Sequence, residues 1–220
     1  YGYARQDRKD QPRVPITAKL IAKLLEVAGT NRILTLDLHS TQIQGFFDIQ
    51  ADNLFAAPVI LDYIKQLELS NLMIVSPDVG STKIGRAFAK RLDVDLAIVD
   101  KRRSEKDNVE VMNVIGDVKG RDVVILDDMV TTGGTLVKAA RAVSDKGARS
   151  VIACATHPVF AGDACKIIMN SPIREVIVTN SLPFDRFAEC PKVRVLDISR
   201  LIAEAIKRIH YNESVSTLFV

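Results

Sequence analysis

The chain has 220 residues, 47% of them hydrophobic and 26% charged, with a formal net charge of +3 at pH 7. This balance is typical of a globular protein of one large or two small domains. The net charge is too mild to indicate nucleic acid, which we do not expect as a partner. No apolar run approaches the roughly 20 residues of a membrane span and no signal peptide is evident, so we expect a cytoplasmic protein with no membrane partner.

Apolar runs rich in β-formers alternate along the chain with amphipathic helical patterns. The sequence predicts strands at 33–38, 72–75, 96–99, 123–126, 151–155 and 175–179. It predicts helices at 16–28, 54–67, 82–92, 136–146, 163–169 and 198–210. Because the strands are continuously apolar, we expect a mainly parallel sheet covered on both faces, and therefore an α/β fold. Residues 44–53 are expected to connect two domains, and residues 183–191 to form an irregular loop.

The chain opens with YGYARQD, without an initiator Met and without a preceding strand, so we expect it to lack the beginning of its first domain. Three cysteines, Cys154, Cys165 and Cys190, are widely spaced and include no CxxC pair. Neither a disulfide framework nor a zinc site is therefore indicated.

A loop of small and polar residues, with one lysine, follows the predicted strand 72–75. We expect it to cradle phosphate; its residues are Asp78, Val79, Gly80, Ser81, Thr82 and Lys83. Asp78 could share one Mg²⁺ with His39, which follows the strand 33–38. A histidine after a strand is more often structural. The loop is also a weak motif taken alone, and its weight comes from sharing a sheet edge with the motif at 123–136.

Consecutive basic residues, Lys101-Arg102-Arg103, follow the predicted strand 96–99 and precede a polar stretch. They could form a mobile cationic loop that meets the negative charge of a phosphoryl-type transition state. A solvated basic turn explains them equally well.

The segment VVILDDMVTTGGTL, from Val123 to Leu136, is the strongest signal in the chain. It predicts a buried strand, an acidic pair at the strand's carboxyl end, a phosphate loop and a helix. Asp127 and Asp128 would accept hydrogen bonds from ribose hydroxyls or hold a hydrated divalent cation. The loop that would bind a sugar phosphate consists of Thr131, Thr132, Gly133, Gly134 and Thr135. An ordinary solvated strand–turn–helix connection is the alternative.

This segment resembles the phosphoribosyl-diphosphate motif of the type I phosphoribosyltransferase fold. Further segments make the whole chain resemble the ribose-phosphate diphosphokinase family, also called phosphoribosyl pyrophosphate synthetases: YGYARQDRKD, LDLHSTQIQGFFDI, SPDVG, DKRR, ATHPVF, VTNSLP and AEAIKRIHYNESVSTLF. The resemblance implies two phosphoribosyltransferase-like α/β domains with mainly parallel sheets. Residues 1–52 would be the truncated first domain, and residues 53–220 the second, with the ribose 5-phosphate site.

The resemblance also implies a reaction and roles for particular residues. The family moves the diphosphoryl group of MgATP to the C1 hydroxyl of ribose 5-phosphate and releases AMP, with Mg²⁺ as cofactor. Lys101 and Arg103 match its catalytic loop, and the residues that match its ATP contacts are Arg5, Gln6, Asp10 and His39. A homo-oligomer is expected, dimer-based or hexameric, with a phosphate/ADP effector site. Its lining would correspond here to Arg13, Gln44, Asp52, Asn53, Ser214, Val215 and Ser216.

Two loops depart from the family pattern. Thr131 stands where many members have Asp, and Ser81 to Ile84 replace a more glycine-rich and more basic loop. With the front of the first domain absent, the fragment is expected to bind ribose phosphate without necessarily turning over. Two other functions stay open: a phosphoribosyltransferase, which would not explain Lys101 and Arg103, and a non-catalytic regulatory subunit, which tends to lose the metal and loop residues present here.

Overall fold

The computed structural model of the chain describes residues 1–9, 11–103, 110–186 and 188–219; at 101–103 and 110–111 it describes the backbone. The described chain divides into two units, Tyr1–Ala56 and Ala57–Val220. The domain boundary expected from the sequence, between residues 52 and 53, falls inside a strand of the first unit.

The first unit is small. It contains helix α1 (Thr17–Val27), strand β1 (Arg32–Leu36), the 3-10 helix η1 (Thr41–Phe46) and strand β2 (Gln50–Leu54). The two strands pair in parallel, and a modest core forms beside them from Ala4, Ala22, Leu38, Ile43 and Phe47. Tyr1 closes one side of this core, since its ring packs edge-on against Phe47 and its hydroxyl donates to the Ala18 carbonyl at 2.7 Å.

The second unit is built around a seven-stranded sheet with the order β5-β4-β3-β6-β7-β8-β9. Its strands are β3 (Leu72–Ser76), β4 (Asp95–Arg103), β5 (Glu110–Ile115), β6 (Asp122–Val130), β7 (Ser150–Pro158), β8 (Ile173–Thr179) and β9 (Val193–Leu196). All neighbouring strands are parallel except β4 and β5, which form an antiparallel pair at one edge. The continuously apolar strands thus lie in a mainly parallel sheet, as the sequence predicts.

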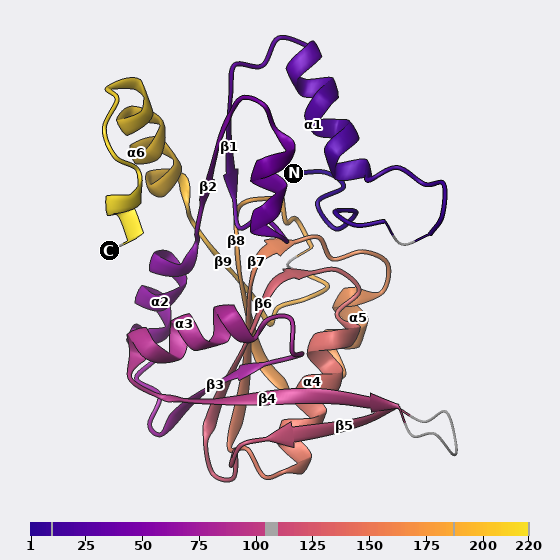
Figure 1. Cartoon of the computed structure of the whole chain (residues 1–220). Coiled ribbons are helices and arrows are strands. Elements are labelled where there is room, and N and C mark those ends of the chain that lie inside the picture. The colour runs from indigo at the N-terminus through magenta and orange to yellow at the C-terminus, as the bar shows by residue number, and fades with distance from the viewer. Residues whose placement is uncertain (10, 104–109, 187, 220) are drawn as a thin grey trace. The chain divides into compact units, whose positions relative to one another are not determined.

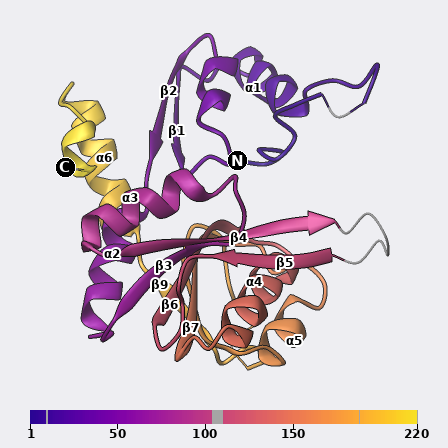
Figure 2. The same cartoon turned by 60° about the horizontal axis from the view of Figure 1, so that its bottom comes forward.

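Helices cover both faces of this sheet. They are α2 (Ala57–Gln66), α3 (Thr82–Leu92), α4 (Gly134–Asp145) and α5 (Ala164–Met169), and the chain ends with α6 (Ser199–His210) and the 3-10 helix η2 (Ser216–Phe219). α4 and α5 lie on one face, and α2 and α3 lie on the other (Figures 1 and 2). The larger core fills the layer under α4 and α5, where Val123, Ile125 and Ala153 of the sheet meet Leu136 and Ile168 of the helices. Every helix among the described residues is too short or too polar to cross a bilayer.

Several sequence-based boundaries were wrong. Residues 44–53 contain the end of η1 and most of β2 rather than a domain connection, and the helix expected from residue 54 begins at Ala57. The strands β5 and β9 were not predicted. Their sequences, like the QADNL of β2, are short or rich in polar residues, so pairing with a neighbouring strand rather than local composition makes them extended.

The three cysteines are buried free thiols. The described residues of the expected irregular loop, 183–186 and 188–191, contain neither helix nor strand.

Candidate functional site

The strand order places one candidate crevice at the centre of the sheet. From β3 the chain moves outward to β4 and β5 on one side, and β6 begins the run to β9 on the other. β3 and β6 are therefore adjacent and parallel, and the direction of winding reverses between them. In open α/β sheets, ligands bind outside the carboxyl ends of the strands at such a switch point. The two loops singled out in the sequence follow these two strands.

The acidic pair lies in the carboxyl-terminal part of β6. Asp127 and Asp128 are both half-buried, and the Asp128 backbone N–H donates to Asp127 Oδ1 at 2.9 Å. The strand runs on to Val130, four residues beyond the expected end at 126, because its pairing with β7 continues to Val130 and Pro158. The acids are thus held by strand geometry rather than by a turn.

Asp127 has an unusual electrostatic environment. Burial, together with the charge of Asp128 and a side-chain hydrogen bond to it, raises the pKa of Asp127 to about 7, and the charge of Asp78 adds to the effect. Two conclusions follow. Asp78 of the first loop lies close enough to interact with the acid pair, and the free protein holds carboxylates together against their repulsion. Such an arrangement is typical of a ligand site.

The loop after β6 places uncapped N–H groups at the start of α4. Gly133 is the N-cap residue of α4 and adopts φ +76°, a left-handed conformation that suits glycine. No side chain caps the helix there by a hydrogen bond. A Cβ at Gly133 would lie 3.3 Å from Ile168 Cγ1, so α5 packs closely against the loop. The loop is also anchored, because Ala161 N–H donates to the Thr131 carbonyl at 3.0 Å. A rigid, uncapped helix N-terminus is suited to an anion.

The loop after β3 is arranged in a similar way at the start of α3. Ser81 is fixed by Asp78, whose Oδ1 accepts from its N–H at 2.9 Å and whose carbonyl accepts from its hydroxyl at 3.1 Å. The N-cap of α3 again has no side-chain hydrogen bond. Among the described residues, the buried hydroxyls of Ser76 and Thr82 have no hydrogen-bond partner. Gly85 allows α3 to approach β3, since a Cβ there would lie 2.3 Å from Ser76 Oγ.

The expectation of a cationic loop at Lys101-Arg102-Arg103 was wrong. The backbone of these residues continues β4, in register with Met112, Val111 and Glu110 of β5. The sequence pointed to a loop because β5 was not recognised, and an unpaired basic run beside a polar stretch has no strand signal of its own. Residues 104–109, which complete the predicted loop, lie outside the described residues.

The expected ATP contacts belong to the first unit. Arg5, Gln6 and His39 are exposed, and Asp10 lies outside the described residues. Gln6 is part of a turn that caps α1, because its carbonyl accepts from the Ala18 N–H at 3.1 Å. Asp78 belongs to the second unit, so magnesium binding shared between His39 and Asp78 stays a prediction.

The residues expected at an effector site are distributed over both units. Arg13, Gln44, Asp52 and Asn53 belong to the first, and Ser214 to Ser216 to the second. Asp52 is paired with Arg32 at 2.8 Å. Ser214 and Ser216 share a hydrogen bond between their hydroxyls at 2.8 Å. A common site stays a prediction.

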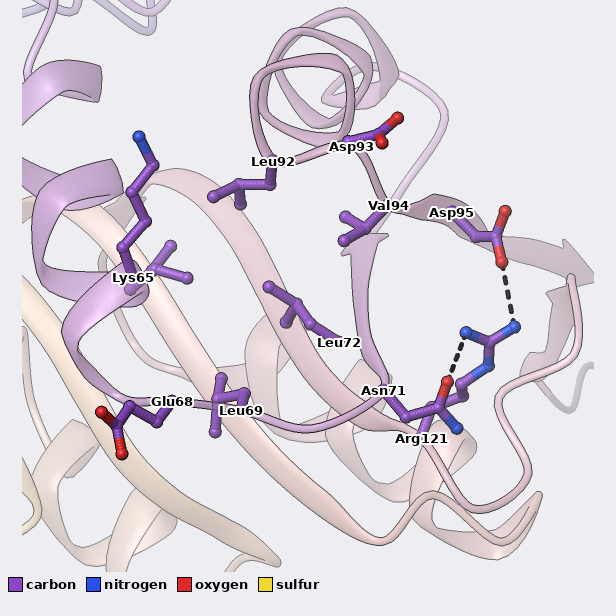
Figure 3. Close-up of a pocket in the computed structure, with 11 residues that line it drawn as sticks. Lys65, Glu68, Leu69, Asn71, Leu72, Leu92, Asp93, Val94, Asp95 and Arg121 are labelled. Carbon is purple, nitrogen blue, oxygen red and sulfur yellow. Dashed lines mark hydrogen bonds and ion pairs between the residues drawn. The ribbon is translucent and has the colours of Figure 1, made fainter.

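A pocket of about 590 Å³ lies at the other end of the strands, where their amino ends lie (Figure 3). It is lined by the ends of α2 and α3 and by the amino ends of β3 and β4, with Leu72, Leu92 and Val94 among its apolar residues. Arg121 forms one side, donating to Asn71 Oδ1 at 2.7 Å and Asp95 Oδ2 at 2.9 Å. No predicted site residue lines this pocket. Helices that follow parallel strands begin at the carboxyl ends of those strands, so an anion-binding site is expected at the switch point rather than in this pocket.

Sequence reasoning assigned no role to one polar pair on the same edge of the sheet. His157 Nδ1 lies 2.9 Å from Ser181 Oγ, at the carboxyl ends of β7 and β8. The ATHP and TNSLP segments contain a signal, a histidine and a serine that directly follow apolar strands, but neither residue belongs to a recognisable loop motif.

Comparisons with known proteins identify the family of the chain. Residues 105–220 match the family model described as phosphoribosyl synthetase-associated domain, and residues 1–29 match the N-terminal domain of ribose phosphate pyrophosphokinase. The chain is 52% identical over 220 residues to a ribose-phosphate pyrophosphokinase of Wolinella succinogenes, covering all of this chain and 71% of that protein. It is 53% identical to that of Chlorobaculum tepidum, covering 68% of the relative.

A solved structure is also similar. The phosphoribosylpyrophosphate synthetase from Mycobacterium smegmatis superimposes with a TM-score of 0.89 at 40% identity, over 96% of this chain and 70% of that one. With 96% of the chain covered, the match extends over both units.

Proposed function

Because the chain belongs to the ribose-phosphate pyrophosphokinase family, we propose that it transfers the β,γ-diphosphoryl group of MgATP to the C1 hydroxyl of ribose 5-phosphate, giving 5-phosphoribosyl 1-diphosphate and AMP. One observation supports this reaction above the others: the two anion-binding loops follow adjacent strands, β3 and β6. Neighbouring strands lie about 4.8 Å apart, so a sugar phosphate and a diphosphate bound to the two loops would be in contact.

The loop after β6 would hold the sugar phosphate. The 5-phosphate would accept hydrogen bonds from the N–H groups at the start of α4 and from the hydroxyls of Thr131, Thr132 and Thr135. Asp127 and Asp128 would accept hydrogen bonds from the two vicinal ribose hydroxyls. Thr131 would add a hydroxyl donor to the phosphate.

The loop after β3 would hold the diphosphate in transit. Its donors are the N–H groups at the start of α3, the hydroxyl of Thr82 and the exposed amine of Lys83. Thr82 Oγ1 supports this role, since it is buried without a partner in the described chain and a phosphate oxygen would satisfy it.

Lys101 and Arg103 would neutralise charge on the diphosphoryl group as it passes between oxygens. The chemistry is direct attack by the C1 hydroxyl on the β-phosphorus, with AMP as leaving group, so positioning and electrostatics supply the rate enhancement. No covalent bond to the protein is needed. Arg5, Gln6 and Asp10 would contribute to ATP binding.

Magnesium suits the oxygen donors of this edge. Mg²⁺ is usually held by one or two carboxylates together with substrate phosphates and water. Within the described ranges no preformed cluster of three or more metal-ligating side chains exists, and Asp78 beside the acid pair meets the smaller requirement. Asp78 and His39 would hold the ion, which would neutralise the phosphates of ATP. A cation here would also relieve the repulsion that raises the pKa of Asp127.

The wider family pattern suggests assembly and regulation. We propose a homo-oligomer in the cytoplasm, dimer-based or hexameric, that responds to phosphate and ADP at the positions Arg13, Gln44, Asp52, Asn53 and Ser214 to Ser216. Sedimentation of the chain with and without phosphate tests the assembly.

The reaction is tested in two separate steps. Calorimetry of the 220-residue chain with ribose 5-phosphate tests the sugar phosphate site, because all the groups proposed to hold this ligand belong to the second unit. Incubation with ATP, Mg²⁺ and ribose 5-phosphate then tests transfer, and AMP should form only when the sugar phosphate is present. Formation of ADP would identify a simple kinase instead. Binding without AMP would show that the chain holds the sugar but needs further residues for turnover.

A further inference from the structure

His157 is the accessible residue near the carboxyl end of β7. The six residues before it, Val151–Thr156, are buried, and so is Pro158 after it, whereas His157 is half-buried. β7 lies in the interior of the sheet between β6 and β8, and helices cover both faces. A side chain of β7 therefore reaches solvent only near an end of the strand. The carboxyl end is the one at which the proposed substrate site lies.

The strand register places His157 near Asp127. Asp127 of β6 is in register with Ala155 of β7, and Met129 with His157. Residues two apart on a strand project from the same face, so His157 and Asp127 project from the same face of neighbouring strands. With strands about 4.8 Å apart and a rise of about 3.3 Å per residue, their Cα atoms are separated by roughly 8 Å. One small ligand bound at the carboxyl ends of β6 and β7 would therefore reach both side chains.

A hydrogen-bond network fixes the imidazole. Its Nδ1 lies 2.9 Å from Ser181 Oγ, and the Ser181 hydroxyl donates to the Thr156 carbonyl at 3.1 Å. The same carbonyl accepts from Thr179 Oγ1 at 2.7 Å, and Thr179 Oγ1 accepts from the Ser181 N–H at 3.2 Å. Because the single hydroxyl proton of Ser181 is directed at a carbonyl, Nδ1 must be the donor to Ser181. The other ring nitrogen, Nε2, is thereby held in one orientation.

The segment after His157 is tied to the phosphate loop. Phe160 N–H donates to the Val130 carbonyl at 2.9 Å, and Ala161 N–H to the Thr131 carbonyl at 3.0 Å. His157 is thus connected through a short, hydrogen-bonded segment to the residue that begins the loop. The same hydrogen-bonded segment therefore fixes the backbone on both sides, at His157 and at the loop.

We propose that His157 is a substrate-contacting residue whose imidazole Nε2 binds the ribose 5-phosphate held by Asp127, Asp128 and the loop Thr131–Thr135, and that Ser181 is its positioning residue. This inference rests on the proposed function, because it names a further contact to the same sugar phosphate. It adds β7 and β8 to a site otherwise built from β3 and β6.

The test combines calorimetry with NMR of the histidine rings of the 220-residue chain. Only three histidines are present, so the ring ¹⁵N signals of His157 can be separated from those of His39 and His210. On titration with ribose 5-phosphate, the Nε2 signal of His157 should shift with the dissociation constant found by calorimetry. His210, exposed at the end of α6, should not respond.

Variants of His157 and Ser181 distinguish a direct contact with ribose 5-phosphate from a purely structural role. His157→Ala should weaken ribose 5-phosphate binding about tenfold, the value of one hydrogen bond, and His157→Gln, whose amide reaches a similar position, should recover most of it. Ser181→Ala should change the balance of ring tautomers, and Ser181→Thr should restore it. His210→Gln is the matched control.

Each outcome decides between the two proposals. Wild-type binding with an unshifted His157 ring, or equal binding by wild type and a folded His157→Ala, would overturn the inference and leave the proposed function standing. Absence of ribose 5-phosphate binding by the wild-type chain would overturn the proposed function, and the inference with it.

Discussion

Replacing Asp127 with Asn should stabilise the protein and weaken its ligand site. Asn has the shape of Asp, and its Oδ1 can still accept the Asp128 N–H, now 2.9 Å from the carboxylate. What the substitution removes is a half-buried negative charge beside Asp128 and Asp78. The change is therefore an electrostatic one, with packing conserved.

The magnitude follows from the pKa of Asp127, which burial and Asp128 raise from 3.8 to about 7. Each pKa unit corresponds to about 1.4 kcal/mol, so the charged residue costs at most about 4 kcal/mol above pH 7. The sign follows from proton binding. Between about pH 4 and pH 7 the folded protein retains a proton on Asp127 that the unfolded chain has released, so stability falls as pH rises through this window.

Urea unfolding monitored by circular dichroism from pH 4.5 to pH 8 measures this effect. Asp127→Asn should exceed the wild type by about 1 kcal/mol at pH 4.5 and by about 2–4 kcal/mol above pH 7. Asp62→Asn is the matched control, because Asp62 is exposed in the middle of α2. Its difference from wild type should be small and nearly independent of pH.

Two results would refute the reasoning. An Asp127→Asn variant no more stable than wild type at pH 8 would show that the acid pair is not under electrostatic strain. A gain that is constant across the pH range would assign it to packing instead. The same variant should bind ribose 5-phosphate less tightly, because an amide supplies one acceptor where a carboxylate supplies two.

Three further changes test the rest of the site. Gly133→Ala should lower the free energy of unfolding by about 1–2 kcal/mol, because an L-residue is strained at φ +76° and the methyl would press on Ile168. Gly134→Ala is the control: its methyl meets ordinary contact distances, so it should not lower stability in the same denaturation experiment. Lys101→Ala and Arg103→Ala should reduce kcat for AMP formation far more than they reduce ribose 5-phosphate affinity. Loss of affinity in both variants with kcat preserved would show instead that these residues bind substrate. Arg102→Ala, between them in the sequence, is the control. Asp128→Ala should weaken ribose 5-phosphate binding, measured by calorimetry, about 10- to 100-fold, which is the value of a hydrogen bond to a charged group. Unchanged affinity would show that the acid pair is solvated and does not bind the sugar.

The centre of the fold was predictable because its signals are local. Val123 to Leu126 are apolar without interruption, and a strand of that kind is buried on both faces whatever surrounds it. Gly133 likewise marks the start of α4, since the left-handed conformation is one that few other residues adopt. The strands β3 and β6, and the loops that follow them, were therefore predictable from the sequence.

The edges of the sheet were not predictable in this way. β5 (Glu110–Ile115) becomes a strand because β4 offers an unpaired edge, and β4 in turn continues through Lys101–Arg103 because β5 pairs with it. Neither strand has a complete signal of its own, so the basic run was interpreted as a loop. His157 was overlooked for a related reason: its nearness to Asp127 comes from the register of β6 and β7, which only the folded sheet determines.

The position of the site also follows from what its ligands need rather than from the shape of the surface. The pocket at the amino ends of the strands has a mixed polar and apolar lining, and its Arg121 is already hydrogen-bonded to Asn71 and Asp95. The crevice at the carboxyl edge has the opposite character, because Asp127 is charged at a cost and the first turns of α3 and α4 lack side-chain caps. A protein gains no stability from these features when it is free. A ligand that brings hydroxyl groups, phosphate oxygens and a divalent cation would satisfy all of them together, so the unfavourable terms of the free protein become favourable terms of binding.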